Sequence, residues 1–102
     1  MPGFDLCPDP AAALTPADLT GALRRYRVWA GEPSYRVMAA RTRHVCAAST
    51  LHAALNSQQL PPLATVQAIV TACGGTPEHY QAFTTAWRRI RLASPTSAAL
   101  AH

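Results

Sequence analysis

The sequence predicts a single, compact, all-α domain, and three observations support this fold class. The chain has 102 residues, which is enough for one domain with one modest core. Hydrophobic residues make up 49% of it, and because alanine supplies much of that share, close helix packing is favoured over a β-sheet. Apolar residues recur at intervals of three and four along five segments, which is the period of an amphipathic helix.

An irregular N-terminal arm, residues 1–14, is expected before the first helix, because its prolines follow no sustained period. The helix opens with a start signal. Thr15 is the N-cap, Pro16 is the first helical residue and Asp18 stands three residues after the cap. Gly31 supplies the left-handed residue at which helices often stop. The first helix is therefore expected to end just before this glycine.

Two short helices follow. The first of them is expected over residues 33–43, and a connection of about five residues, 44–48, leads to the next. That next helix spans about 48–57 and directs Leu51 and Leu55 inward, since they stand four residues apart.

The fourth and fifth helices are bounded by proline and glycine. The fourth begins at Pro62 and ends at the glycine pair 74–75, and residues 76–78 repeat the start signal of the first helix. The domain therefore covers residues 15–93, and residues 94–102 are expected to form a flexible tail. The residues expected in the core are Leu23, Trp29, Met38, Leu51, Leu55, Val66, Val70, Phe83 and Trp87.

The charge pattern favours a polyanionic partner. All nine basic residues are arginine, and against five acids they give a formal charge of +4 and a pI of about 9.5. A basic balance attracts nucleic acid. The arginines form three groups along the chain, which are Arg24, Arg25 and Arg27; Arg36, Arg41 and Arg43; and Arg88, Arg89 and Arg91.

Neither a membrane span nor a secretory signal is expected. Polar residues and prolines over 56–62 interrupt the uncharged middle of the chain, whereas a span needs about 20 consecutive, mostly apolar residues. The N-terminus MPGFDLCPDP has no basic cluster followed by an apolar run. The expected location is the cytoplasm.

Three widely spaced cysteines, Cys7, Cys46 and Cys73, fit reduced thiols better than a disulfide framework. Cys46 and Cys73 with His44 and His79 can be imagined as a zinc site, but no CxxC or HxxxH pair supports it. We therefore expect neither metal nor cofactor. We also expect no enzyme, since no two of the five acids are placed as a pair for acid–base chemistry.

Two short helices around a tight connection, the second with one apolar and one small polar face, form a helix-turn-helix pattern. The segments WAGEPSYRVMAAR, STLHAAL, LPPLATVQAIVTACGGTPEHY and AWRR follow one another in the chain. Together, over residues 15 to about 92, they resemble the lambda-repressor-like (XRE-type) helix-turn-helix family, in particular an actinobacterial branch of it. The resemblance implies a compact five-helix fold whose third helix enters the major groove of double-stranded DNA while the second crosses the DNA backbone.

Carried over position by position, the resemblance assigns a base-reading face to the third helix. Asn56 would pair with adenine, His52 with guanine or a phosphate, and Ala53 would touch a thymine methyl group. Ser49 completes this face. The alternative is that all four residues are ordinary solvated surface.

The resemblance also implies phosphate contacts from Arg36, Arg41 and Arg43, because these residues lie on the helix that crosses the backbone. The alternative interpretation is again that these three arginines lie on an ordinary solvated face. The sequence departs from the family pattern in two ways. Residues 42–46 contain no glycine where the family has a tight Ala-Gly turn, and the reading helix contains no arginine or lysine.

Two functions from different classes follow. The leading one is a sequence-specific, DNA-binding transcriptional regulator, acting as a homodimer because two half-sites multiply a weak single contact. The exposed part of a stripe of Tyr80, Phe83, Trp87 and Ile90 is a candidate dimer interface, although such a stripe is more often core. The alternative is an adaptor that keeps the fold and holds a partner protein, as the arginine-free reading helix favours.

Overall fold

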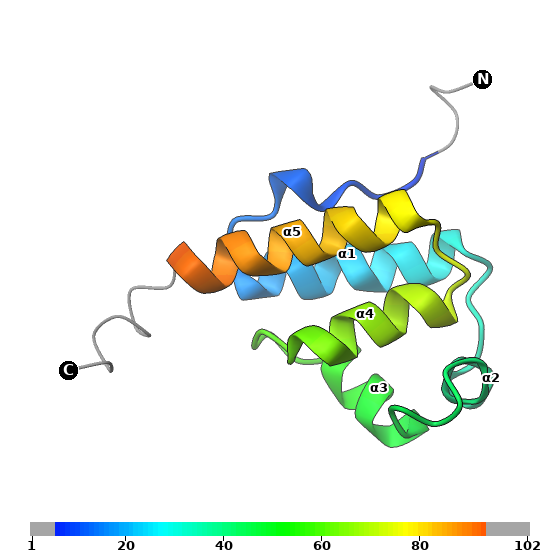
Figure 1. Ribbon diagram of the computed structural model, residues 1–102. Helices are drawn as coiled ribbons and strands as arrows, with labels where there is room; N and C mark the ends of the chain where they lie inside the picture. The colour runs from blue at the N-terminus through cyan, green and yellow to red at the C-terminus, as the bar shows by residue number, and fades with distance from the viewer. Residues whose placement is uncertain (1–5, 94–102) are drawn as a thin grey trace.

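Five α-helices form the protein in the computed structural model, which describes residues 6–93 (Figure 1). Within that range there is no strand, so the all-α prediction is confirmed. The expected C-terminal tail, 94–102, lies outside the described residues. The elements are the 3₁₀-helix η2 (Pro10–Ala12), α1 (Pro16–Trp29), α2 (Tyr35–Arg41), α3 (Ala48–Leu55), α4 (Leu63–Ala72) and α5 (Pro77–Ala93). None of these helices is long and apolar enough to cross a membrane.

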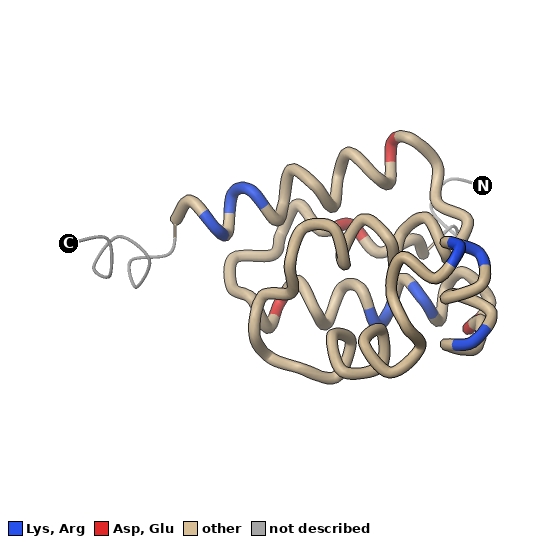
Figure 2. The backbone as a smooth tube through the Cα atoms, turned by 60° about the horizontal axis from the view of Figure 1, so that its bottom comes forward, with Lys and Arg blue, Asp and Glu red and all other residues tan. Residues whose placement is uncertain are grey.

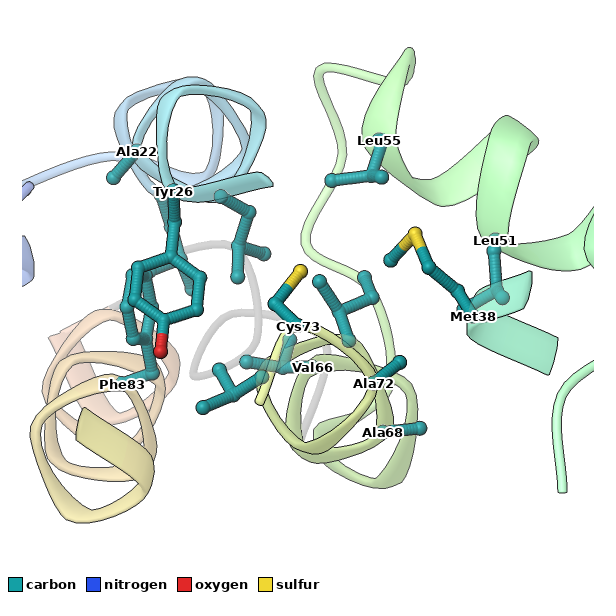
Figure 3. Packing of buried hydrophobic residues seen from close by; sticks show 14 of the residues in the cluster. Ala22, Tyr26, Met38, Leu51, Leu55, Val66, Ala68, Ala72, Cys73 and Phe83 are labelled. Atoms are coloured by element: carbon teal, nitrogen blue, oxygen red, sulfur yellow. The ribbon is translucent and has the colours of Figure 1, made fainter. Parts of the chain in front are cut away.

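Helix α4 lies at the centre and contacts the other four α-helices. In Figure 1, α1 and α5 run side by side on one flank of α4, while α2 and α3 lie on the other. Figure 3 shows the same division among core side chains. Tyr26 and Phe83 pack on one side of α4, and Met38, Leu51 and Leu55 pack on the other.

The core prediction is confirmed except at its two tryptophans. Trp87 is only partly buried, and its indole N–H donates a 2.7 Å hydrogen bond to the Pro61 carbonyl. Trp29 is wrong as a core residue, because 38% of it is exposed. It lies in the last turn of α1 and stacks on the ring of Tyr26, with 5.6 Å between ring centroids, so Tyr26 fills the core position instead.

The expected start signals operate as helix caps. The Thr15 hydroxyl accepts a 3.1 Å hydrogen bond from the Asp18 N–H, and the Asp18 carboxylate accepts one from the Thr15 N–H. A further hydrogen bond from the Leu14 N–H is the main cause that lowers the pKa of Asp18. Thr76 caps α5 in a similar way by accepting from the His79 N–H.

The described part of the N-terminal arm, residues 6–14, is more ordered than its irregular sequence predicts. Asp9 accepts a hydrogen bond from the Ala11 N–H, which caps η2, and both Pro10 and Ala13 are buried. Arg89 of α5 donates to the carbonyls of Pro10 at 3.1 Å and Ala13 at 2.9 Å. As in α1, an N-cap residue followed by proline begins η2. The segment was not predicted as a helix, because it is too short to show an apolar period.

The connection after α2 closes without glycine. The His44 N–H donates to the Ala39 carbonyl at 2.8 Å and the Arg43 N–H to the Ala40 carbonyl at 3.0 Å, which is the Schellman pattern. This pattern needs a left-handed residue after the helix, and here Arg43 (φ 54°) and His44 (φ 61°) both adopt that conformation. The ends of α1 and α4 use Gly31 and Gly74 at the equivalent place.

We therefore expect Arg43→Gly to stabilise the fold by about 1 kcal/mol, because glycine adopts the left-handed conformation without steric cost. For a domain of this size the melting temperature should rise by about 4–8 °C. Thermal unfolding followed by circular dichroism measures this rise. The control is Ala40→Gly in the same helix, which should cost about 1 kcal/mol. A lower melting temperature for Arg43→Gly would contradict the left-handed turn.

Candidate nucleic-acid interface

The candidate interface consists of α2, the connection 42–47 and α3. Ser34 caps α2 by accepting a 3.1 Å hydrogen bond from the Val37 N–H. Ala47 stands at the equivalent position of α3 and makes no side-chain cap. The first amide groups of α3 therefore have no side-chain cap, and the positive end of the helix dipole favours an anion there.

The structure brings the four predicted base-reading residues together on the exposed side of α3. Ser49, His52, Ala53 and Asn56 are all exposed, opposite the inward side of the helix. The helix ends at Leu55, earlier than expected. Ser49 and Ala53 are short, so the helix backbone can come close to a ligand along this line.

Two of these residues also have partners within the protein. Asn56 is the C-cap residue, and its amide nitrogen donates a 2.8 Å hydrogen bond to the His52 carbonyl. One of its two amide hydrogens is thus used. The His52 imidazole meets the ring of Tyr35 edge-on, with 5.1 Å between ring centroids.

Arg27 of α1 contacts the Tyr35 ring of this pair. The Arg27 guanidinium lies 4.3 Å from the centroid of the Tyr35 ring, so the three side chains form the stack Arg27–Tyr35–His52. Arg27 also donates to the Pro33 carbonyl at 2.9 Å and lies 3.8 Å from the Glu32 carboxylate. Sequence reasoning missed this role, because the stack joins the end of α1 to α3 through α2.

The three predicted phosphate-binding arginines separate into two kinds. Arg36 is exposed on α2, and Arg43 is exposed in the connection rather than on the helix. Arg41 instead donates a 2.9 Å hydrogen bond to the Ala72 carbonyl and so caps the end of α4. All three arginines are exposed, but Arg41 is already engaged by this hydrogen bond within the protein.

Acidic residues are absent from this part of the sequence. Between Glu32 and Glu78 there is no aspartate or glutamate, so α2, α3, α4 and their connections bring three arginines and no carboxylate. Figure 2 shows the arginines of α2 and its following turn at one end of the molecule and those of α5 at the other. The end that carries α2 is consequently positive.

An apolar groove runs beside α3, with a volume of about 470 Å³. The loop between α3 and α4 forms its far wall. Its lining includes two residues of the predicted reading face, Ser49 and Ala53. The rest of the lining consists of Thr50, Ala54, Ser57, Gln59, Leu60, Pro61, Pro62 and Thr65. No sequence pattern predicted this groove, because an irregular loop builds it.

The remaining predictions concern metals and the dimer stripe. Within residues 6–93 no three histidines, cysteines or acids lie close enough to hold a metal ion. Cys46 and Cys73 are buried free thiols, and burial raises the pKa of Cys73 to about 11. In the stripe of α5, Phe83 and Ile90 are buried, Trp87 is partly buried and Tyr80 is 38% exposed. Most of the stripe therefore belongs to the core, and Tyr80 is its exposed part.

Comparisons of this chain with models of protein families, with characterised proteins and with solved structures found no match. Its function is accordingly argued from the geometry of the interface.

Proposed function

We propose that this protein is a helix-turn-helix DNA-binding regulator that places α3 in the major groove. The observation that carries the proposal is the exposed face of α3, with short side chains next to an acid-free region that bears Arg36 and Arg43. An α-helix with its side chains is about 10–12 Å in diameter, and the major groove is about 12 Å wide. The dimensions of α3 suit that groove.

Each part of the interface has a defined task in this proposal. Arg36 and Arg43 neutralise phosphates and supply affinity that does not depend on sequence. Ser49 and Ala53 let the helix approach the base edges. His52 reads a base, and the stack on Tyr35 limits the orientations of its imidazole ring before DNA binds.

A second candidate is favoured by the apolar groove. As an adaptor, the protein would use the same face of α3 to hold an apolar segment of a partner protein between α3 and Leu60–Pro62. The hydrogen bonds that engage Arg41 and Asn56 within the protein are in keeping with this function. Both candidates use α3, so the experiment must distinguish the ligand.

Salt dependence and sequence dependence of DNA binding make that distinction. Arg36→Gln or Arg43→Gln should each lower the log–log salt slope by about 0.9, because one fewer counterion is released per lost phosphate contact. His52→Ala and Asn56→Ala should each cost about 1–3 kcal/mol on a selected duplex and little on a scrambled one. Fluorescence anisotropy at several salt concentrations, on a duplex recovered by selection from random DNA, measures both effects.

The matched control is Arg88→Gln, an exposed arginine of α5 that lies away from α3. It should leave the salt slope nearly unchanged. If selection recovers no sequence motif and the Arg36 and Arg43 variants bind like the wild type, the adaptor becomes the better proposal.

A further inference from the structure

A second group of chemically competent side chains lies on the opposite flank of α4 from α3. The Cys7 sulfur of the N-terminal arm is 3.6 Å from Nε2 of His79 on α5. Nδ1 of the same imidazole is 2.8 Å from the Tyr26 hydroxyl on α1. A nucleophile next to a base, which is in turn oriented by a third group, is the arrangement that activates a nucleophile.

The orientation of the His79 imidazole is well determined. The rings of Tyr26 and Trp29 meet it edge-on, with centroids 5.4 Å and 5.6 Å away. Tyr26 is fully buried, and burial raises its pKa to about 12, so its hydroxyl stays neutral at ordinary pH. A neutral hydroxyl can accept the hydrogen bond of Nδ1–H, and that tautomer presents an unprotonated Nε2 to the thiol.

We propose that Cys7 is an activated thiol and a site of oxidation by small hydroperoxides, with His79 as its base and Tyr26 as a positioning residue. The thiol proton passes from Cys7 Sγ to His79 Nε2, and the thiolate attacks the terminal oxygen of the hydroperoxide. A sulfur–oxygen bond forms, the oxygen–oxygen bond breaks, and the alkoxide or hydroxide that leaves takes the proton from the imidazolium. Cysteine is oxidised to sulfenic acid and the peroxide is reduced to an alcohol or water.

The other two cysteines serve as internal references. Cys46 and Cys73 are each only 8% exposed, and the raised pKa of Cys73 keeps its thiol protonated. Cys7 is half-buried, and its neighbours in the chain, Leu6 and Pro8, line an open pocket on α1. A small reagent therefore has a route to the arm, whereas Cys46 and Cys73 are enclosed.

The charged and titratable groups around this thiol come from three helices. His79 is supplied by α5, Tyr26 by α1 and Cys73 by the end of α4. Arg24 and Arg25 of α1 line the pocket next to Leu6 and Pro8. The Cys7 thiol also donates to the Pro8 carbonyl at 3.9 Å, a contact that is given up when the proton passes to His79.

The size of the expected acceleration of Cys7 oxidation follows from the fraction of the cysteine that is present as thiolate. A cysteine with pKa 8.5 is about 3% thiolate at pH 7, and one with pKa 7 is about 50% thiolate. Part of this gain is offset, because a less basic thiolate is a weaker nucleophile. A shift of that size would give a net acceleration of about threefold.

Brief treatment of the native protein with hydrogen peroxide and dimedone, followed by mass spectrometry of the peptides, tests the proposal. Cys7 should be labelled before Cys46 and Cys73. His79→Gln should slow labelling about threefold at pH 7 and move the midpoint of thiolate absorbance at 240 nm to higher pH. Tyr26→Phe, which keeps the buried ring, should move the midpoint in the same direction by less.

The control variant is His44→Gln, because His44 is an exposed histidine of the connection 42–47. It should change neither the rate nor the midpoint. Equal rates and midpoints for wild type and folded His79→Gln would overturn the proposal, as would Cys7 labelling no faster than the same cysteine in an unfolded peptide. Circular dichroism establishes that each variant is folded.

Discussion

Leu51→Ala is expected to lower the free energy of unfolding by about 2–5 kcal/mol, the range for leucine truncations in packed cores. The side chain is fully buried on the inner face of α3. Figure 3 shows it packed beside Met38 on the flank of α4 that carries α2 and α3. Because small domains are stable by only about 5–15 kcal/mol, this loss is a large share of the total.

Urea denaturation followed by circular dichroism measures the change. Thr50→Ala, at the adjacent exposed position of α3, is the matched control and should stay within about 0.5 kcal/mol of the wild type. Unchanged stability of Leu51→Ala would show that α3 does not pack through this residue.

Gly75→Ala should destabilise the protein by about 3 kcal/mol, at the upper end for overpacking. A Cβ atom at this position would lie 2.5 Å from the Val70 side chain, 2.6 Å from the Tyr26 hydroxyl and 2.9 Å from the Val70 carbonyl. The carbonyl belongs to the last turn of α4 and accepts the Gly75 N–H, so it cannot move without breaking that helix end.

The neighbouring glycine gives the comparison. Gly74→Ala would meet nothing within 4 Å and would suffer only from its φ of +78°, at a cost of about 1 kcal/mol. Differential scanning calorimetry of the two variants separates steric clash from backbone strain. If Gly74→Ala is the more damaging, the close approach of Gly75 to Tyr26 is wrong.

Helix boundaries were predictable from the sequence because their causes are local. The Thr15–Asp18 capping box and the stop at Gly31 depend on residues three or four apart. Apolar period also identified the exposed face of α3. The apolar period wrongly placed Trp29 in the core. Periodicity identifies which face of a helix is buried, but not how far along the helix its neighbours cover that face.

The partners of individual side chains were not predictable, since they are distant in sequence. Arg24 donates to the Leu55 carbonyl and Arg41 to the Ala72 carbonyl, each 31 residues away. Cys7 and His79 are separated by 72 residues. Only the packing of the helices and the arm against one another brings such pairs together, so the grouping of charge along the chain did not reveal which arginines bond to distant carbonyls.

Each group of arginines thus contains at least one whose guanidinium connects two parts of the fold. Arg24 ties α1 to the end of α3, Arg41 ties α2 to the end of α4, and Arg89 ties α5 to the arm. In Arg89 a single atom, Nη2, donates to both carbonyls, and in Arg24 and Arg41 a single Nη1 atom donates to one. Reducing the basicity of this surface without loosening the fold would therefore require residue-by-residue choice, sparing these three positions and Arg27, which donates to the Pro33 carbonyl.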